Sequence, residues 1–295
     1  MKKHSHRQQM RLVGKNGQFN LNIVRLGSSP LGFSDLYHWL QTLSWSGFFG
    51  RIALLYVLSN ALFALVYLAG GDCIANAQPG DFKDAFFFSV QTMATIGYGA
   101  MYPRTSYANI VVAIEALFGL LGVAMVTGLA FARFSRPTAK VLFSRIAVIT
   151  TQDGVPTLIY RTANQRYNQI LEAQQRLTLV RDEVTAEGQF MRRFYDLNLV
   201  RSQTPIFALT WTVMHVIDES SPLYGMTIED LVKHQVEIVV TMTGIDETVS
   251  QTIHARHSYL AGEILWNMRF VDILSKSPDG KRFVDYTRFH DVIPL

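Results

Sequence analysis

Two long apolar stretches, separated by a more polar region, dominate the first half of this 295-residue chain. Ile52 to Ala69 carries no charge, and Ala108 to Phe131 carries only Glu115. Because about 20 apolar residues are enough for a helix to cross the hydrocarbon core of a bilayer, both stretches predict membrane-spanning helices. We expect an outer helix at about 50–70 and an inner helix at 107–135.

The polar region between these stretches begins with a short helical pattern. Phe82 to Thr92 contains neither Gly nor Pro, and Asp81 stands where its side chain can cap the first turn. We predict a helix at 82–93 whose carbonyl end, with its partial negative charge, points toward the membrane centre and favours a cation. This segment is therefore interpreted as a pore helix.

The five residues at 95–99, Thr95-Ile96-Gly97-Tyr98-Gly99, have the pattern of a potassium selectivity filter. A Gly-Tyr-Gly triplet alone is usually a loop, so its place after a short helix and between two apolar stretches decides the interpretation. A filter needs consecutive backbone carbonyls that point at one axis and replace the hydration shell of K⁺. Gly97 and Gly99 adopt positive φ without steric cost. One copy makes a quarter of a ring, so we predict a homotetramer.

Several residues of the apolar stretches are candidates for support and gating. Glu115 is ionisable at membrane depth, where such a group is costly and by default functional or paired. We expect it to support the filter from behind, with direct ion contact in the cavity as the alternative. Gly119 could let the inner helix bend, or could simply allow close packing. Phe131 is a candidate hydrophobic gate, unless its ring contacts lipid. Asn60 should face protein.

Basic residues flank the apolar stretches and are scarce between them. They comprise Lys2, Lys3, Arg7, Arg11, Lys15, Arg25 and Arg51 before or at the edge of the first, and Arg133, Arg136, Lys140 and Arg145 after the second. The positive-inside rule predicts a multi-pass protein of the cell inner (plasma) membrane with both termini in the cytoplasm. Topology thus explains the net charge of +4, and nucleic-acid binding gains no support.

The flanking segments have patterns of their own. Residues 1–32 are polar and basic and form an N-terminal cytoplasmic segment, with one strand expected at 22–26. At 33–47, aromatic and aliphatic residues recur at helical spacing, which predicts an amphipathic helix in the membrane interface; a surface helix of the soluble domain is the alternative. The pore domain would cover 48–136.

The pattern changes at Pro137, which ends the inner helix. From there to residue 295, short β-branched or alternating runs recur between turn sequences, which predicts a β-sandwich. A short helix is expected at Ile228 to His234, because Thr227 and Asp230 have capping-box spacing. The fold class is a membrane α-helical pore domain joined to an all-β domain at 137–295.

Other chemistry has little support. Cys73 is the only cysteine, which excludes an intrachain disulfide. His254 and His257 form an H-x-x-H pair, but in a strand these side chains point to opposite faces, so we expect no metal site there. No Walker loop, dinucleotide fingerprint or nucleophile elbow occurs. We expect neither catalytic residues nor a cofactor, with K⁺ as the permeant ligand at the filter.

Three further segments resemble the prokaryotic inward rectifier potassium channels of the KirBac type. Residues 132–137, Ala-Arg-Phe-Ser-Arg-Pro, are similar to that family's junction between the inner helix and the cytoplasmic domain. Residues 215–224 and 258–266 are similar to two of its cytoplasmic signatures. The resemblance covers nearly the whole chain and implies a homotetramer with an immunoglobulin-like cytoplasmic domain that prolongs the pore.

The resemblance also implies roles along the pore. It places Phe131 at the helix-bundle gate and Gly119 at the hinge. Glu187 matches a position where an acidic side chain faces the cytoplasmic pore and would concentrate cations. The loop that narrows this pore would be formed by Gly244, Ile245, Asp246 and the two residues after them.

Three positions depart from the family pattern. Val123 stands where strongly rectifying members carry Asp or Asn, so block by polyamines or Mg²⁺ should be weak. Gln91 replaces a pore-helix Glu, and Ala100 follows the filter where animal members often carry Arg. The ion pair that braces the filter in those members is therefore missing. We assign the supporting role to Glu115 and Gln91.

Regulation by anionic phospholipids is a further implication of the resemblance. Arg133, Arg136 and Lys140 lie just after the inner helix, and Arg51 lies at the start of the outer helix. Each such basic residue can hold an anionic headgroup at about 1 kcal/mol near a charged surface. Charges that only set the topology are the alternative.

We therefore predict an inward rectifier-type channel for passive, selective K⁺ transport, gated at the inner-helix bundle and the cytoplasmic domain. The alternative is a non-conducting lipid- or ligand-sensing membrane protein with a vestigial filter. The intact filter sequence argues against it. A poorly selective cation pore is the third interpretation.

Overall fold

The computed structural model describes residues 11–14, 17, 35–276 and 279–295. They form two compact units that meet in the chain between Arg136 and Pro137. The pore unit comprises the described residues up to Arg136 from residue 35 on, and the β unit comprises residues 137–295 with 11–14 and 17. The strand expected at 22–26 and the first two residues of the interfacial helix, 33–34, lie outside the described residues.

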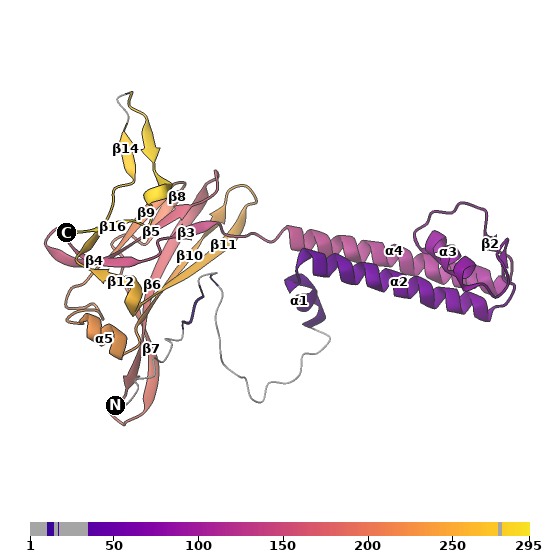
Figure 1. The fold of residues 1–295 in the computed structure, drawn as a ribbon, viewed down its shortest axis with the longest axis horizontal. Coiled ribbons are helices and arrows are strands. Elements are labelled where there is room, and N and C mark those ends of the chain that lie inside the picture. The colour runs from indigo at the N-terminus through magenta and orange to yellow at the C-terminus, as the bar shows by residue number, and fades with distance from the viewer. Residues whose placement is uncertain (1–10, 15–16, 18–34, 277–278) are drawn as a thin grey trace, which may run out of the picture. The chain divides into compact units, whose positions relative to one another are not determined.

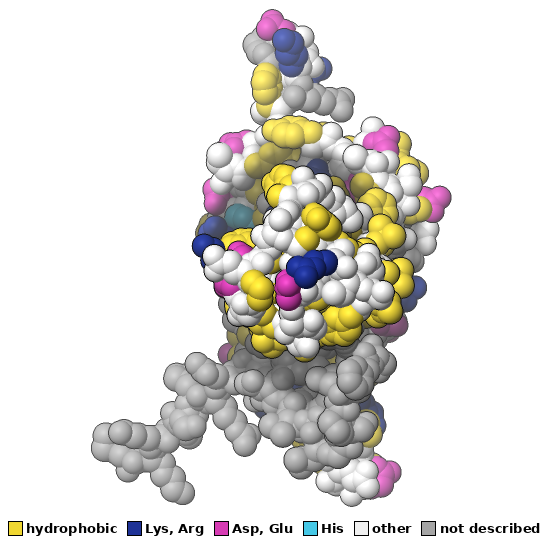
Figure 2. All heavy atoms as spheres, turned by 90° about the vertical axis from the view of Figure 1, so that its right-hand side faces the viewer, with side chains coloured by type: hydrophobic (Ala, Val, Ile, Leu, Met, Phe, Trp, Pro, Cys, Tyr) yellow, Lys and Arg dark blue, Asp and Glu magenta, His cyan; other side chains and the backbone are white. Residues whose placement is uncertain are grey.

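The pore unit is built from four helices and one short strand pair. Its elements are α1 (Asp35–Thr42), α2 (Trp45–Ala69), β1 (Ile74–Ala75), α3 (Phe82–Met93), β2 (Tyr102–Pro103) and α4 (Ser106–Phe134). Helices α2 and α4 are long and apolar enough to cross a membrane. They run side by side, and α3 packs against both near one end (Figure 1). Seen from that end, the surface shows hydrophobic side chains with few charged ones among them (Figure 2).

Side-chain caps fix where these helices begin. The Ser44 hydroxyl accepts a hydrogen bond from the Gly47 N–H at 3.1 Å, so α2 begins at Trp45 rather than near 50. The interfacial helix consequently ends at Thr42, five residues before the predicted end at 47. Asp81 caps α3 through the Lys83 N–H at 2.8 Å, and α3 covers the residues expected for the pore helix.

The β unit consists mainly of two five-stranded sheets. Its strands are β3 (Val141–Phe143), β4 (Ala147–Gln152), β5 (Val155–Asn164), β6 (Ile170–Val184), β7 (Phe190–Leu197), β8 (Gln203–Phe207), β9 (Thr210–Val216), β10 (Glu237–Asp246), β11 (Gln251–Leu260), β12 (Ile264–Trp266), β13 (Met268–Phe270), β14 (Leu274–Lys276), β15 (Arg282–Val284) and β16 (Val292–Pro294). One sheet has the order β11-β10-β6-β7 with β8 also on β6, and the other has β12-β4-β5-β3 with β9 also on β5. The helix α5 (Ile228–Lys233) starts with the predicted capping box.

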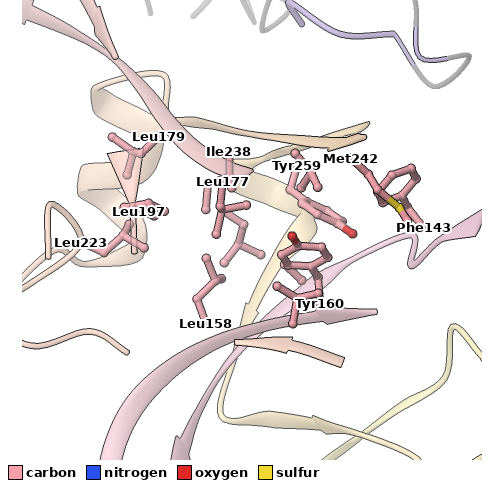
Figure 3. Close-up of a cluster of buried hydrophobic side chains, with 14 of the residues drawn as sticks. Phe143, Leu158, Tyr160, Leu177, Leu179, Leu197, Leu223, Ile238, Met242 and Tyr259 are labelled. Carbon is pink, nitrogen blue, oxygen red and sulfur yellow. The ribbon is translucent and has the colours of Figure 1, made fainter. Parts of the chain in front are cut away.

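A hydrophobic core joins these two sheets. Figure 3 shows side chains of β5, such as Leu158, opposite side chains of β6 and β10, such as Leu177 and Ile238. The rings of Tyr160 and Tyr259 approach one another with centroids 5.8 Å apart. Alternation of buried and less buried residues along β6 and β10 places one face of each strand in this core, as a sandwich requires.

The segment 11–14 is held on the β unit by side chains. The buried carboxylate of Glu237 accepts hydrogen bonds from the N–H groups of Leu12 at 2.9 Å and Val13 at 3.3 Å. The Ser258 hydroxyl donates to the Val13 carbonyl at 3.0 Å. Arg11 forms an ion pair with Glu263. These contacts occupy the backbone polar groups of a segment that has only an isolated bridge in place of a regular strand.

Candidate functional site

The backbone of the filter loop alternates between positive and negative φ. Thr95, Gly97 and Gly99 have φ of 56°, 61° and 79°, and Ile96 and Tyr98 between them have negative φ. Such alternation turns successive peptide planes the same way, so that N–H groups lie along one edge and carbonyls along the other. A single strand of this kind presents a row of carbonyl oxygens, which is the arrangement an ion-coordinating filter needs.

The positive φ of Thr95 was not predicted from the sequence, because a β-branched residue rarely adopts it. Its cause is the end of α3. Ala94 is the C-cap, the Thr95 N–H donates to the Thr92 carbonyl at 3.0 Å, and the Ile96 N–H donates to the Gln91 carbonyl at 2.8 Å. These bonds form a Schellman motif, in which the residue after the cap takes the left-handed conformation and is usually Gly. Thr95 thus ends the pore helix and begins the filter.

The outer end of the filter loop is tied to the segment that follows α2. The Asn76 amide donates to the Ala100 carbonyl at 2.8 Å. Arg104 and Asp72 form an exposed ion pair at 2.9 Å, and β1 pairs with β2 beside it. Ala100 stands where animal members of the resembled family often carry Arg. In this chain the Asn76 side chain holds that position through the Ala100 backbone carbonyl.

A buried polar network lies behind the filter and joins three helices. The Tyr67 hydroxyl of α2 donates to Glu115 Oε2 of α4 at 2.6 Å, and Glu115 Oε1 is hydrogen-bonded to Ser89 Oγ of α3. Ser89 Oγ also lies 3.0 Å from Asn60 Oδ1 of α2. Tyr67 is 1% exposed and the other three are fully buried. Asn60 faces protein, and Glu115 contacts the pore helix.

Gly119 sits where α4 passes the end of the pore helix. A Cβ at this position would lie 2.5 Å from the Met93 carbonyl oxygen, so the close approach requires glycine. This contact supports the close-packing alternative. At Gly122, by contrast, a Cβ would meet nothing within 4 Å. The Gln91 side chain forms no hydrogen bond within the described residues; its backbone carbonyl holds the filter through Ile96.

Several apolar side chains of the filter and of the inner helix are exposed to solvent in the single chain. Tyr98 is 75% exposed, so its ring does not pack against the pore helix of its own chain. Phe131, one turn before the end of α4, is 72% exposed. Val123 is also exposed. These side chains are available to neighbouring chains, to a pore or to lipid.

The arginines assigned to lipid binding contact the α1–α2 junction. Arg133 donates to the carbonyls of Leu40, at 3.2 Å, and Leu43, and its guanidinium lies over the Trp45 ring at 4.7 Å. Arg136 donates to the Gln41 carbonyl at 3.4 Å. These carbonyls lie at or just after the end of α1, where helices leave acceptors unsatisfied. Arg133 and Arg136 therefore anchor α1 to the end of α4.

The other two basic residues differ in their surroundings. Arg51 donates to the Gly47 carbonyl at 3.0 Å, and its guanidinium lies over the Trp39 ring at 4.8 Å. Lys140 is exposed on the β unit. Because Arg51, Arg133 and Arg136 have hydrogen-bond partners in the pore unit while Lys140 is exposed on the β unit, the four residues are not equivalent.

The residues assigned to the cytoplasmic loop need a correction. Gly244, Ile245 and Asp246 continue strand β10, and the turn is formed by residues 247–250. A Cβ at Gly244 would lie 2.5 Å from Ile170 Cγ2, beside a bulge between β10 and β6. Strand pairing with β11 extends to Asp246 and so excludes it from the loop.

Asp246 does not offer a free charge. It is 2% exposed and accepts hydrogen bonds from Arg166 at 2.9 Å, from Asn168 at 2.8 Å and from the Thr248 N–H at 2.9 Å. Burial raises the pKa of Asp246, but these three donors outweigh it and hold the pKa below its ordinary value. Arg166 also donates to Thr138, close to where the chain leaves α4.

Glu187, in contrast, is exposed in the turn between β6 and β7. A hydrogen bond from Thr185 lowers the pKa of its carboxyl, which therefore stays ionised at neutral pH. Glu172 is a second exposed acidic residue. It has a φ of 48° at the bulge opposite Gly244, and no local sequence pattern predicted it.

Comparison with known proteins accounts for both units. The model of the inward rectifier potassium channel C-terminal domain matches residues 141–295, and that of the ion channel family matches residues 52–136. The inward rectifier potassium channel Kirbac3.1 of Paramagnetospirillum magnetotacticum is 52% identical over 278 residues, which cover 94% of each chain. The ATP-sensitive inward rectifier potassium channel 12 of Gallus gallus is 31% identical, covering 95% of this chain and 71% of its own.

Two membrane helices around a pore helix and filter loop, followed by a β-sandwich, define a potassium channel with a cytoplasmic domain and not an enzyme. More narrowly, the chain belongs to the inward rectifier potassium channel family and is of the prokaryotic KirBac type. The predicted family and fold class are thereby confirmed.

Proposed function

We propose that four copies of this chain surround one pore and conduct K⁺ passively through a filter formed by the carbonyls of Thr95, Ile96, Gly97, Tyr98 and Gly99. The observation that supports this most directly is the alternating φ at 95–99, which gathers the carbonyls on one edge of the loop. Four such edges around an axis replace the hydration shell of K⁺, and several adjacent sites allow rapid exchange between ions.

The inner-helix end is the proposed gate. Four Phe131 rings, exposed in the single chain, close a narrow pore by excluding water when they face the axis. Gly119 is proposed as the hinge, although its contact with Met93 gives it a packing role as well. Movement of the β unit reaches the gate through the covalent link at Pro137.

The cytoplasmic pore is proposed to carry carboxylates that concentrate cations. Glu187 is exposed and ionised, whereas Asp246 is paired with Arg166 and acts by holding the end of β10 and its turn in place. With Val123 in the inner helix, no acidic side chain binds polyamines or Mg²⁺ there, and rectification is weak.

Anionic phospholipids are the proposed regulators. Arg51, Arg136 and Lys140 are exposed and available to headgroups. Arg51, Arg133 and Arg136 are proposed to bind lipid with the donors that their contacts to α1, α2 and the segment between them leave over. The protein is placed in the cell inner (plasma) membrane with both termini in the cytoplasm, from the distribution of Lys and Arg.

The test is uptake of ⁸⁶Rb⁺ into liposomes that contain the purified channel, with Ba²⁺ as blocker and anionic lipid content varied. Selective conduction predicts Ba²⁺-sensitive uptake of rubidium in large excess over sodium. Uptake equal to that of empty vesicles in every lipid composition would favour the non-conducting sensor, and comparable sodium uptake would favour a poorly selective pore. Cross-linking of the detergent-solubilised protein should stop at four chains.

A further inference from the structure

The network behind the filter forms an unbranched chain of hydrogen-bonding groups across three helices. It runs from Tyr67 through Glu115 and Ser89 to Asn60, and none of the four side chains is more than 1% exposed. Bulk solvent therefore does not reach these groups. Every contact in the chain has to be satisfied by a proton that one of its own members carries.

The orientation of Asn60 is fixed at one end. Its Nδ2 donates to the Tyr56 carbonyl at 2.7 Å and faces Met93 Sδ at 3.5 Å. A flipped amide would bring its oxygen against the Tyr56 carbonyl oxygen, and two acceptors repel. The Asn60 oxygen therefore faces Ser89 Oγ at 3.0 Å and needs a proton from it.

A hydroxyl carries only one proton. If Ser89 donates to Asn60, the contact between Ser89 Oγ and Glu115 Oε1 needs its proton from Glu115. Tyr67 supplies the remaining contact by donating to Glu115 Oε2. With an ionised Glu115, one of the two Ser89 contacts would be left without a proton. With a protonated Glu115, each contact holds one.

The charges around Glu115 lead to the same assignment. Its two partners are hydroxyls, and among the described residues it forms no ion pair. An unpaired carboxylate at membrane depth is expensive, and a neutral acid that donates a hydrogen bond avoids this cost.

We propose that Glu115 is a neutral carboxylic acid and that Tyr67, Glu115, Ser89 and Asn60 act as a positioning chain for the pore helix. Ser89 lies on α3, whose last turn continues into the filter through the Schellman motif at Thr95. The chain therefore holds α3 between α2 and α4 and sets where the filter begins. The proposal rests on the proposed selective conduction and adds its means of support.

Glu115→Gln tests the proposal because a glutamine amide reproduces both bonds. Its nitrogen donates to Ser89 and its oxygen accepts from Tyr67. We expect Glu115→Gln to keep the rubidium-to-sodium uptake ratio and the half-blocking Ba²⁺ concentration of the wild type. Glu115→Leu should change both by about tenfold, because it leaves buried hydroxyls without partners.

Ser89→Ala and Tyr67→Phe each remove a single hydroxyl of the chain. They replace Glu115→Leu in this test if that variant does not assemble. They should shift the same two quantities in the same direction by less. If Glu115→Gln behaves like Glu115→Leu, the charge of the side chain matters and the neutral acid is wrong. If Glu115→Leu, Ser89→Ala and Tyr67→Phe all match the wild type in both quantities, the positioning role is wrong.

Infrared difference spectra between the wild type and Glu115→Gln separate this proposal from the conduction proposal. The C=O stretch of a protonated carboxylic acid should be present in the wild type at neutral pH and lost in Glu115→Gln. The exposed Glu229 offers a matched control, since Glu229→Gln should leave that band unchanged. Absence of the band from the wild type would overturn the neutral acid even in a conducting channel. A channel without flux that keeps the band would overturn conduction alone.

Discussion

The pore unit and the β unit are stabilised in opposite ways. In the β unit, apolar side chains such as Leu177 and Ile238 are buried between two sheets and form most of the core, although Glu237 and Asp246 are also buried, with hydrogen-bond partners. In the pore unit, many apolar side chains face outward, and the buried centre behind the filter contains hydrogen-bonded polar groups. A membrane supplies the apolar surroundings that the β unit must build for itself. Polar contacts can therefore specify the position of the pore helix.

The largest expected effect concerns the filter backbone. Gly97→Ala places a Cβ at a φ of 61°, which an L-residue adopts only with strain. We expect Ba²⁺-sensitive rubidium uptake to fall to the level of empty vesicles while the oligomer is retained. Gly50→Ala is the control, because Gly50 has negative φ and open space around its Cβ position. Normal uptake by Gly97→Ala would contradict the filter assignment.

Loss of core volume should affect the β unit alone. Leu177 is 2% exposed between the sheets, so Leu177→Ala should lower the free energy of unfolding by about 2–5 kcal/mol. Calorimetry of the purified channel would measure this. The rubidium-to-sodium ratio of channels that remain folded should not change. A changed rubidium-to-sodium ratio would show that selectivity in the pore unit depends on the core of the β unit.

Overpacking between α4 and the pore helix should affect the pore unit. Gly119→Ala brings a methyl group to 2.5 Å from the Met93 carbonyl and should cost about 1–3 kcal/mol of stability. Gly122→Ala, with nothing within 4 Å, is the matched control. Thermal unfolding monitored together with flux distinguishes two roles. Reduced flux at unchanged stability would argue for a hinge and against a packing role.

An effect of similar size is expected where β10 ends. Asp246→Ala removes the acceptor of three hydrogen bonds and leaves Arg166 unpaired, which should cost about 1–3 kcal/mol. Glu247→Ala, one residue further and exposed, should cost almost nothing. Chemical denaturation of both variants would compare them. Equal stability would mean that the ion pair between Asp246 and Arg166 contributes nothing.

The smallest effect is a pH dependence in the β unit. Burial lowers the pKa of His215, outweighing the Asn198 carbonyl and Asp218, which favour its protonated form. The unfolded chain then binds a proton that the folded chain does not, so stability is lost as the pH falls below about 6.5. We expect His215→Gln to reduce the dependence of the melting temperature on pH. His254→Gln, at an exposed position, should leave it unchanged.

The comparison of the two units also shows what the sequence could predict. Apolar length and the Asp81 cap predicted the membrane helices and α3, and capping-box spacing predicted α5, because each signal lies within a few residues. The partners of Glu115 lie 26 and 48 residues away, and no local pattern specifies such pairs. Asn60 and Glu115 were recognisable as polar residues in apolar stretches, but Tyr67 and Ser89 were not.

Errors arose where a hydrogen bond or a strand pairing overrides the intrinsic preference of a residue. Thr95 has a β-branched side chain, yet the helix end imposes a left-handed conformation on it. Asp246 looked like a loop residue beside Gly244, but pairing with β11 extends through it and Arg166 neutralises its charge. The Ser44 hydroxyl caps the first turn of α2, so the helix begins at Trp45 and not near residue 50 as predicted.

The Schellman motif at Thr95 has a mechanical consequence. The carbonyls of Gln91 and Thr92 are bound to the amides of Ile96 and Thr95, the first two residues of the proposed filter, so the last turn of the helix and the start of that filter share one hydrogen-bonded ring. Fraying of the last helical turn would therefore distort the first carbonyls of the proposed filter directly.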